Sequence, residues 1–195
     1  AEFEENKDRY ELDKVIAFRT DTFYGLGADP FNSDAVARIR ALKGREDDKP
    51  ILLLIADLAQ LDRLIVERSV EFDKIAARFW PGPLTIIGKA VDDLPDEITA
   101  GTGTVGVRLP NDESVRKLVR DCGGVLTATS ANPAGQSPAR SAAEVRAYFP
   151  EGIYLIIDGG EVTATEPSTV LDATTSPPRI VREGAIRAAD LIAHA

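Results

Sequence analysis

The chain has 195 residues, of which 44% are hydrophobic and 28% charged, as is ordinary for a globular domain with a sizeable core. Its 23 Lys and Arg residues and 32 Asp and Glu residues give a net charge of −9, which disfavours a broad nucleic-acid surface but leaves local basic patches open. No apolar run approaches the roughly 20 residues of a membrane span, and the acidic start AEFEENKDRYELD does not resemble a signal peptide, so we expect a cytoplasmic protein without a membrane segment.

Hydrophobic periodicity and turn residues divide the chain into alternating strands and helices. Ser33 is expected to cap the first helix and Gly44 to end it, while Ser141 and Glu144 form a capping box at a later helix. In chain order we predict a strand at 14–18, a polar loop at 19–32, a helix at 33–43, a strand at 51–55, helices at 57–67 and 71–80, strands at 84–90 and 104–109, a helix at 113–122, a strand at 124–130, a helix at 141–149, strands at 153–160, 167–174 and 179–184, and a helix at 185–194. The interleaving predicts an α/β fold: a single layered domain over residues 1–195, built on a twisted, mostly covered mixed β-sheet.

The sequence holds one cysteine, Cys122, and one histidine, His194, and this scarcity excludes several kinds of chemistry. The two residues cannot supply an intrachain disulfide, a Cys/His zinc site or a Ser-His-Asp triad. Cys122 is interpreted as a small packing residue at a helix end. Any chemistry must then use hydroxyls, cations, carboxylates, backbone amides or a bound metal.

Polar side chains gather where the predicted strands end. The stretch TATSANPAG ends an apolar strand in Ser130 and Asn132, either as an ordinary turn or at the strand edge where α/β sheets bind ligands. Further hydroxyls stand at the ends or edges of other strands, namely Thr22, Thr104 and Ser168. Each one could be an unremarkable turn residue.

Two arginines and one charged loop are the candidate anion-binding groups. Arg108 and Arg182 lie in strand-like segments, where a guanidinium is costly to bury unless a carboxylate or phosphate meets it. The loop KGREDDKP brings Lys43, Arg45 and Lys49 together, although alone it is equally a solvated surface loop. It lacks the GxxxxGK[ST] pattern of a P-loop.

Two other patterns are set aside. The GxG sequences at 25–27 and 101–103 do not open helices, so they do not indicate a dinucleotide-binding fingerprint. Phe79 and Trp80 could stack on a base, but their helical spacing favours a place in the core.

Seven segments, taken in order, resemble the motifs of the YrdC-like family of threonylcarbamoyl-AMP synthases. TDTFYGLGADP resembles the family's T-[DE]-T-x-Y-G-L-G motif, and KGREDDKP resembles its K-x-R-x-x-x-[KN]-P loop. The other five segments follow in the family's order and are PGPLT, TVGVRLP, TSANPAG, STVLD and VREG. The resemblance runs from about Val15 to Gly184 and implies a YrdC-like fold of the short, single-domain type.

The resemblance implies an enzyme that joins L-threonine, bicarbonate or CO2, and ATP into threonylcarbamoyl-adenylate and pyrophosphate. Such a nucleotidyltransferase supplies the activated intermediate for N6-threonylcarbamoyladenosine at position 37 of tRNAs, and a downstream threonylcarbamoyl transferase uses it. Because the substrate amine and then the carbamate act as nucleophiles, no protein nucleophile is required. A magnesium ion would accompany ATP and be held mainly by phosphates and water, not by a protein metal site.

The same resemblance assigns roles by position in the motifs. Thr22, Arg108 and Ser168 would bind L-threonine, with Arg108 pairing with the substrate carboxylate. Lys43 and Arg45 would be the catalytic cations beside the phosphates. The residues that would contact ATP are Arg45, Lys49, Thr104, Ser130, Asn132 and Arg182.

Two positions depart from the family pattern. Arg19 stands before TDT where proline is usual, and it could alter the entry to the loop or add charge there. Glu46 stands after the loop arginine where many members have proline. A carboxylate beside a triphosphate is unfavourable unless it points away or helps to hold the metal.

Two other functions stay open. One is an RNA-binding or RNA-maturation module, because the concave face of the family tends to be basic, although the net charge of −9 argues against it. The other is a carbamoyl-transfer module related to the YrdC-like domain of hydrogenase maturation proteins, although the sequence lacks the accessory zinc-finger and acylphosphatase regions.

Overall fold

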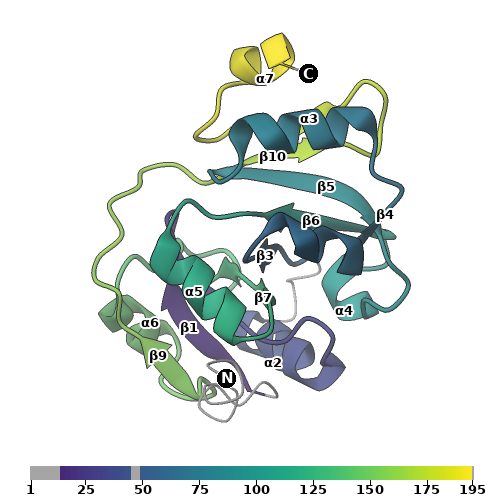
Figure 1. Ribbon diagram of the computed structural model, residues 1–195. Coiled ribbons are helices and arrows are strands. Elements are labelled where there is room, and N and C mark those ends of the chain that lie inside the picture. Colours follow the sequence, from purple (N-terminus) through teal and green to yellow (C-terminus); the bar gives the residue numbers. More distant parts are fainter. Residues whose placement is uncertain (1–13, 45–48, 195) are drawn as a thin grey trace.

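The computed structural model describes residues 14–44 and 49–194, and within them the strands form two mixed sheets (Figure 1). The smaller sheet has the order β8-β2-β1-β9, and the larger has the order β11-β10-β5-β6-β3-β7, with β4 pairing on β5. The predicted α/β class with mixed pairing is confirmed, but the strands are divided between two sheets rather than placed in one. One domain over residues 1–195 stays a prediction.

The smaller sheet is centred on β1 (Ile16–Arg19), which runs antiparallel to β2 (Tyr24–Gly27) and parallel to β9 (Leu155–Ile157). On its other side β2 pairs antiparallel with β8 (Thr129–Ser130). The prediction of a polar loop over 19–32 is therefore wrong for the four residues of β2. Their hydrogen-bonding partners lie on both sides, which makes β2 an inner strand in spite of its two glycines.

The larger sheet contains the long predicted strand β5, whose bounds agree with the sequence. Its neighbours β6 and β10 carry polar residues at the ends that lie beside the start of β5. In chain order the strands of this sheet are β3 (Leu53–Ile55), β4 (Ile65–Val66), β5 (Leu84–Ala90), β6 (Thr104–Arg108), β7 (Val125–Thr127), β10 (Thr169–Asp172) and β11 (Arg179–Arg182).

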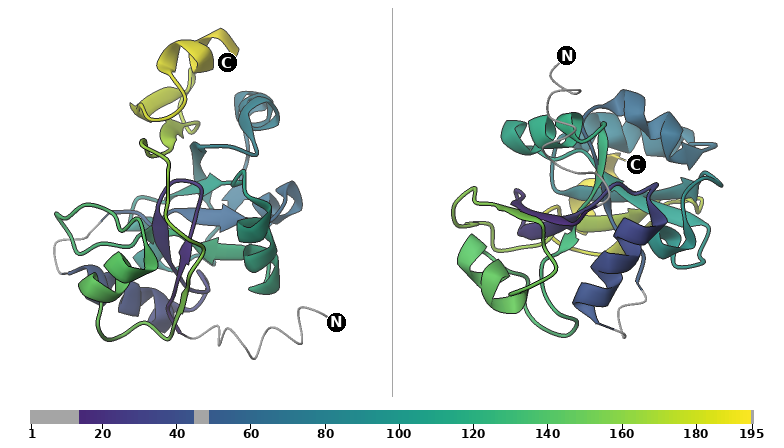
Figure 2. Two further views of the ribbon diagram at one scale, coloured as in Figure 1. Left: turned by 90° about the vertical axis from the view of Figure 1, so that its left-hand side faces the viewer. Right: turned by 90° about the horizontal axis from the view of Figure 1, so that it is seen from below.

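Helices pack around both sheets. Figure 1 shows α3 lying along β5 and β10 and α7 lying beyond α3, and Figure 2 shows α7 at the end of the molecule farthest from α2 and α6. The helices are α2 (Ser33–Lys43), the 3-10 helix η1 (Leu58–Arg63), α3 (Val70–Phe79), α4 (Asp96–Thr99), α5 (Glu113–Asp121), α6 (Ala142–Tyr148) and α7 (Ala188–His194). None of the helices in this part of the chain is both long and apolar enough to cross a membrane.

Two helix predictions need correction. The helix predicted at 57–67 is a 3-10 helix followed by the strand β4, because the apolar end of this segment pairs with β5 instead of continuing the helix. The N-cap of α2 is Asn32 and not Ser33, since the Asn32 side chain accepts the backbone N–H of Ala35 at 3.1 Å. The cap predicted at Ser141 is confirmed, with its Oγ accepting the N–H of Glu144 at 3.1 Å.

The stretch Val125–Ser130 serves both sheets in turn. Its first part, β7, pairs with β3 in the larger sheet, and after Ala128 the chain continues as β8 in the smaller one. The fully buried hydroxyl of Thr127 accepts the N–H of Ala28 at 2.9 Å and donates to the carbonyl of Leu26 at 3.0 Å. This hydroxyl thereby ties the end of β2 to the larger sheet at the place where the strand changes partners.

Two apolar cores result from this arrangement. A smaller core lies between α5 and the strands, with Ile16, Phe18 and Leu126 among its buried members. The larger core includes Trp80, whose indole N–H donates to the carbonyl of Leu84 at 2.7 Å and whose ring meets Phe72 edge-on at 6.1 Å. The interpretation of Trp80 as a core residue, and not as a base-stacking one, is therefore confirmed.

Candidate active site

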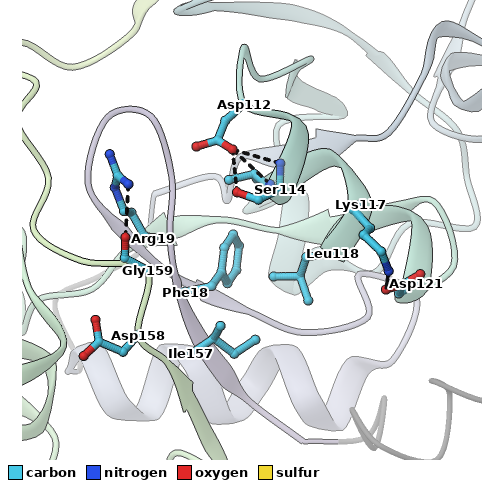
Figure 3. A pocket seen from close by; sticks show the side chains of 11 residues that line it. Phe18, Arg19, Asp112, Ser114, Lys117, Leu118, Asp121, Ile157, Asp158 and Gly159 are labelled. Carbon is cyan, nitrogen blue, oxygen red and sulfur yellow. Dashed lines mark hydrogen bonds and ion pairs between the residues drawn. The ribbon is translucent and has the colours of Figure 1, made fainter.

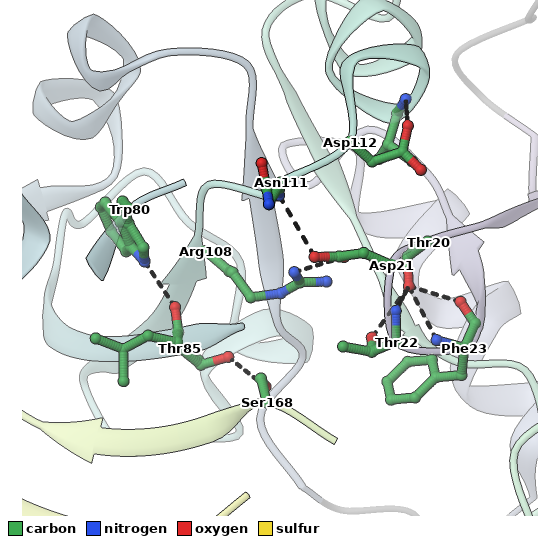
Figure 4. Close-up of polar contacts among 12 residues, drawn as sticks. Thr20, Asp21, Thr22, Phe23, Trp80, Thr85, Arg108, Asn111, Asp112 and Ser168 are labelled. Atoms are coloured by element: carbon green, nitrogen blue, oxygen red, sulfur yellow. Dashed lines mark hydrogen bonds and ion pairs between the residues drawn. The ribbon is translucent and has the colours of Figure 1, made fainter. Parts of the chain in front are cut away.

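The turn between β1 and β2 is held rigid by the hydroxyl of Thr20. This buried oxygen donates to the carbonyl of Phe23 at 2.6 Å and accepts the backbone N–H groups of Thr22 and Phe23 at 3.2 and 3.1 Å. The Thr22 hydroxyl lies 3.1 Å from the same oxygen. The turn therefore presents the side chains of Asp21 and Thr22 from a fixed backbone (Figure 4).

Arg108, the last residue of β6, faces this turn. Its side chain is only 1% exposed, and its Nη1 lies 2.7 Å from Oδ1 of Asp21. The second carboxylate oxygen of Asp21 is 3.4 Å from the backbone N of Asn111. The Nε of Arg108 is buried and has no hydrogen-bond partner in the described part of the chain. A buried donor of this kind is costly unless a ligand meets it.

A hydroxyl pair and a second arginine lie on the neighbouring strands. The Oγ of Ser168 is 2.9 Å from Oγ1 of Thr85, and the Ser168 carbonyl accepts Nη2 of Arg182 at 2.8 Å. Partial burial lowers the pKa of the Arg182 guanidinium from its ordinary value. Because Ile86 on β5 pairs with Val107 on β6, Thr85 stands beside Arg108 in the sheet. The structure thus places Arg108, Ser168 and Arg182 at the same end of the larger sheet. Thr22, in the turn between β1 and β2, lies opposite them (Figure 4).

A second polar group lies farther along β2. The Nζ of Lys43, at the end of α2, donates to the Ser130 carbonyl at 2.5 Å and lies 3.3 Å from its hydroxyl. Ser130 pairs with Gly25, three residues beyond Thr22, so this group adjoins the first. Asn132 is buried; its Nδ2 donates to the carbonyl of Pro133 at 2.9 Å, and its Oδ1 has no partner among the described residues.

Two predicted site residues in the described part of the chain, Thr104 and Lys49, are not brought into contact with these groups. Thr104 starts β6, four residues from Arg108 or about 13 Å along the strand, although the alternation of a strand places both side chains on one face. It lines a cavity of about 450 Å³ together with Lys89. Lys49 is exposed, and its carbonyl accepts Nη2 of Arg40 at 2.8 Å. Arg45, like Glu46, lies outside the described residues, so its role stays a prediction.

Two residues of the site were not found by sequence reasoning. Asp21 lies inside the TDT motif, and the expected cost of burying Arg108 without a carboxylate was the signal that could have pointed to it. Thr85 gave no such signal, because a threonine within an apolar strand is ordinary and only the pairing of β5 with β10 brings it to Ser168.

The described residues do not include a group of side chains suited to hold a metal ion. Among residues 14–44 and 49–194, no three Asp, Glu, His or Cys side chains stand close enough to hold an ion. The carboxylate of Asp21 is already paired with Arg108.

Arg19, which stands where the family pattern has proline, is among the residues that line a separate pocket of about 330 Å³ beside α5, with its guanidinium turned away from the centre (Figure 3). Its Nη1 donates to the carbonyl of Gly159 at 3.1 Å, so it ties the start of the turn to the segment after β9. Figure 3 shows apolar side chains, including Phe18 and Leu118, at the centre of this pocket and charged ones around them. Arg19 pairs with Tyr24 in the β1–β2 ladder, so its charge lies on the Tyr24 side of β1, opposite the face that Phe18 turns toward α5.

Comparison with known proteins places this geometry in a family. A family model, Sua5_yciO_yrdC, described as "Telomere recombination", matches residues 9–184. A threonylcarbamoyl-AMP synthase of Pyrococcus abyssi is 42% identical over 89% of this chain and 51% of its own length. One from Halorhodospira halophila is 37% identical over 81% of this chain and 83% of its own. The chain thus spans about half the length of the first of these relatives and most of the second.

A solved structure agrees with the sequence comparisons. The crystal structure of P. abyssi Sua5 complexed with L-threonine matches with a TM-score of 0.90 and 37% identity, covering 98% of this chain and 58% of that one. The resemblance seen in the motifs is confirmed over the same region. The chain belongs to the Sua5–YciO–YrdC family, and its fold is the YrdC-like fold.

Proposed function

We propose that the chain is a threonylcarbamoyl-AMP synthase, a nucleotidyltransferase that forms threonylcarbamoyl-adenylate and pyrophosphate from L-threonine, bicarbonate or CO2, and ATP. The observation that carries the proposal is the fully buried Arg108 with an unpartnered Nε, set among the hydroxyls of Thr22, Thr85 and Ser168. A buried guanidinium with a free donor suits a small carboxylate, and the hydroxyls around it suit a polar amino acid.

The chemistry suits the groups that are present. The threonine amine attacks CO2 to form a carbamate, and a carbamate oxygen then attacks the α-phosphate of ATP while the bond to pyrophosphate breaks. Both nucleophiles belong to the substrates, so the protein has to align two anions and stabilise charge that develops on the phosphate. Lys43 brings positive charge beside Ser130 and Arg182 brings it beside Ser168, and we assign Lys43 and Arg45 the catalytic role.

We assign the remaining substrate contacts to the two groups of polar side chains described above, one around Arg108 and the other around Lys43. Arg108, Thr22 and Ser168 bind threonine. ATP lies toward Lys43 and Ser130, where the buried Oδ1 of Asn132 offers an acceptor. Magnesium, when bound with ATP, neutralises phosphate charge, and the remaining ATP contacts are assigned to Arg45, Lys49, Thr104 and Arg182. The product passes to a threonylcarbamoyl transferase that modifies tRNA, and a cytoplasmic location is part of the proposal.

The test is pyrophosphate release from ATP by the purified chain. We expect release only when L-threonine and bicarbonate are both present, and label from ¹⁴C-bicarbonate should appear in a nucleotide product. Release that is unaffected by leaving out threonine would contradict the proposal. Turnover of ATP with carbamoyl phosphate, but without threonine, would support a carbamoyl-transfer module instead. RNA affinity that falls steeply with salt, without pyrophosphate release, would support an RNA-binding module.

A further inference from the structure

The ion pair between Asp21 and Arg108 uses only part of the guanidinium. Asp21 accepts from Nη1 at 2.7 Å, while Nε is buried without a partner in the described part of the chain. A guanidinium can bind a carboxylate with two parallel hydrogen bonds through Nε and the Nη on the same side. The Asp21 contact through Nη1 leaves the Nε atom of this edge without a partner among the described residues.

Asp21 is the charged group that fixes how the guanidinium is turned. The polar side chain beside Arg108 on the neighbouring strand is that of Thr85, a neutral hydroxyl 2.9 Å from the Ser168 hydroxyl. Asp21 itself stands in the turn whose backbone is held by Thr20, and its side chain is 18% exposed. A carboxylate with a preset position can hold a long side chain in one orientation at little further entropic cost.

We propose that Asp21 is a positioning residue: it holds Arg108 by Nη1 so that the Nε edge is presented to the carboxylate of the substrate. This inference rests on the proposed function, in which Arg108 binds threonine. The pair is neutral overall, because one positive and one negative charge meet. The site therefore favours a ligand with two oxygens in the plane of the guanidinium edge over a simple monatomic anion.

The test compares L-threonine with L-threoninol, in which a CH2OH group replaces the carboxylate. Calorimetry gives the dissociation constants of both ligands for the wild-type chain and for Asp21→Ala and Asp21→Asn. The matched control is Glu113→Gln, which removes the same charge from an exposed side chain of α5. We expect the preference for threonine over threoninol to fall by about 10- to 100-fold in Asp21→Ala, the scale of one charge-assisted contact, and by less in Asp21→Asn. Glu113→Gln should keep the wild-type preference.

A general loss of structure would weaken both ligands equally, so an unchanged preference in Asp21→Ala and Asp21→Asn overturns the inference. A second readout is the ¹H–¹⁵N signal of the Arg108 Nε–H group, assigned by its loss in Arg108→Lys. We expect slow exchange with solvent in the wild-type chain and faster exchange in both Asp21 variants, and equal exchange in all would also overturn it. Wild-type binding of threonine without pyrophosphate release would overturn the proposed function alone.

Discussion

Arg182, at the end of β11, donates to the backbone carbonyl of Ser168 through Nη2 at 2.8 Å and Nε at 3.3 Å. The cation is thereby fixed beside the residue that precedes β10. We expect Arg182→Ala to lower kcat/KM for ATP about 10- to 100-fold, because a charge-assisted contact to phosphate is lost and the Ser168 carbonyl loses its partner. Steady-state pyrophosphate release measures this.

Arg179→Ala is the matched control for that experiment. Arg179 lies on the same strand, with a side chain that is 71% exposed and only a 3.8 Å ion pair with Asp172. It should keep the wild-type kcat/KM. Equal effects of the two substitutions would remove Arg182 from the ATP site.

Lys43 is buried and holds the Ser130 carbonyl at 2.5 Å. In Lys43→Ala this carbonyl loses a charged partner and the phosphates lose a nearby cation. We expect a rise in KM for ATP or a fall in kcat, of at least about tenfold, with little change in KM for threonine. Lys74→Ala on the exposed face of α3 should behave as wild type. A change confined to the KM for threonine would contradict the assignment of Lys43 to the nucleotide.

Thr127 offers a test of stability rather than activity. In Thr127→Val the volume is kept, but the N–H of Ala28 and the carbonyl of Leu26 each lose a buried partner. We expect the free energy of unfolding to fall by about 2 to 4 kcal/mol, measured by urea denaturation. The exposed Thr163→Val should change it by less than about 0.5 kcal/mol. A Thr127→Val protein as stable as wild type would show that this hydroxyl does not join the sheets.

Cys122 gives a prediction about alkaline pH. Burial raises the pKa of its thiol from 9.0 to about 12, with the neighbouring Asp121 as a smaller cause. Above pH 9 the unfolded chain loses this proton while the folded chain keeps it, so stability is fully present below pH 9 and falls as the pH rises toward 12. The slope due to this group is up to about 1.4 kcal/mol per pH unit. Denaturation at pH 8 to 11 should show a steeper loss in wild type than in Cys122→Ala, and parallel curves would contradict the assignment.

The elements that sequence reasoning found are those whose signals are local. Strand β5 is an apolar run that begins after Pro81 and Pro83, and its predicted bounds agree with the structure. Strand β2 was missed because Gly25 and Gly27 weaken the strand signal of Tyr24 and Leu26, and one of its partners, β8, lies about 100 residues away. The helix prediction for residues 57–67 was wrong for a related reason, because the end of this segment becomes a strand only through its pairing with β5.

In the candidate site, too, sequence reasoning found residues with a local signal and missed contacts between distant segments. Family motifs led to Arg108, Ser168 and Arg182, which do lie together, but they could not show that the partner of Arg108 is a residue 87 positions earlier. Thr104 was reached by the same motif as Arg108, and the length of β6 separates the two. Distances along a strand are fixed by backbone geometry, whereas contacts between strands depend on pairing that a single sequence does not record.

The passage of Val125–Ser130 from one sheet into the other bears on how ligands enter and leave. Ala128 stands between hydrogen-bonded pairs of both sheets, with Thr127 opposite Leu53 on one side and Thr129 opposite Leu26 on the other. A hinge rotation of the two sheets against each other would leave both ladders intact, but it would break the bonds that Thr127 makes to Leu26 and Ala28. If the chain has the proposed function, these bonds oppose motion between the sheets, and exchange of its substrates is expected to depend on local rearrangement of turns and side chains.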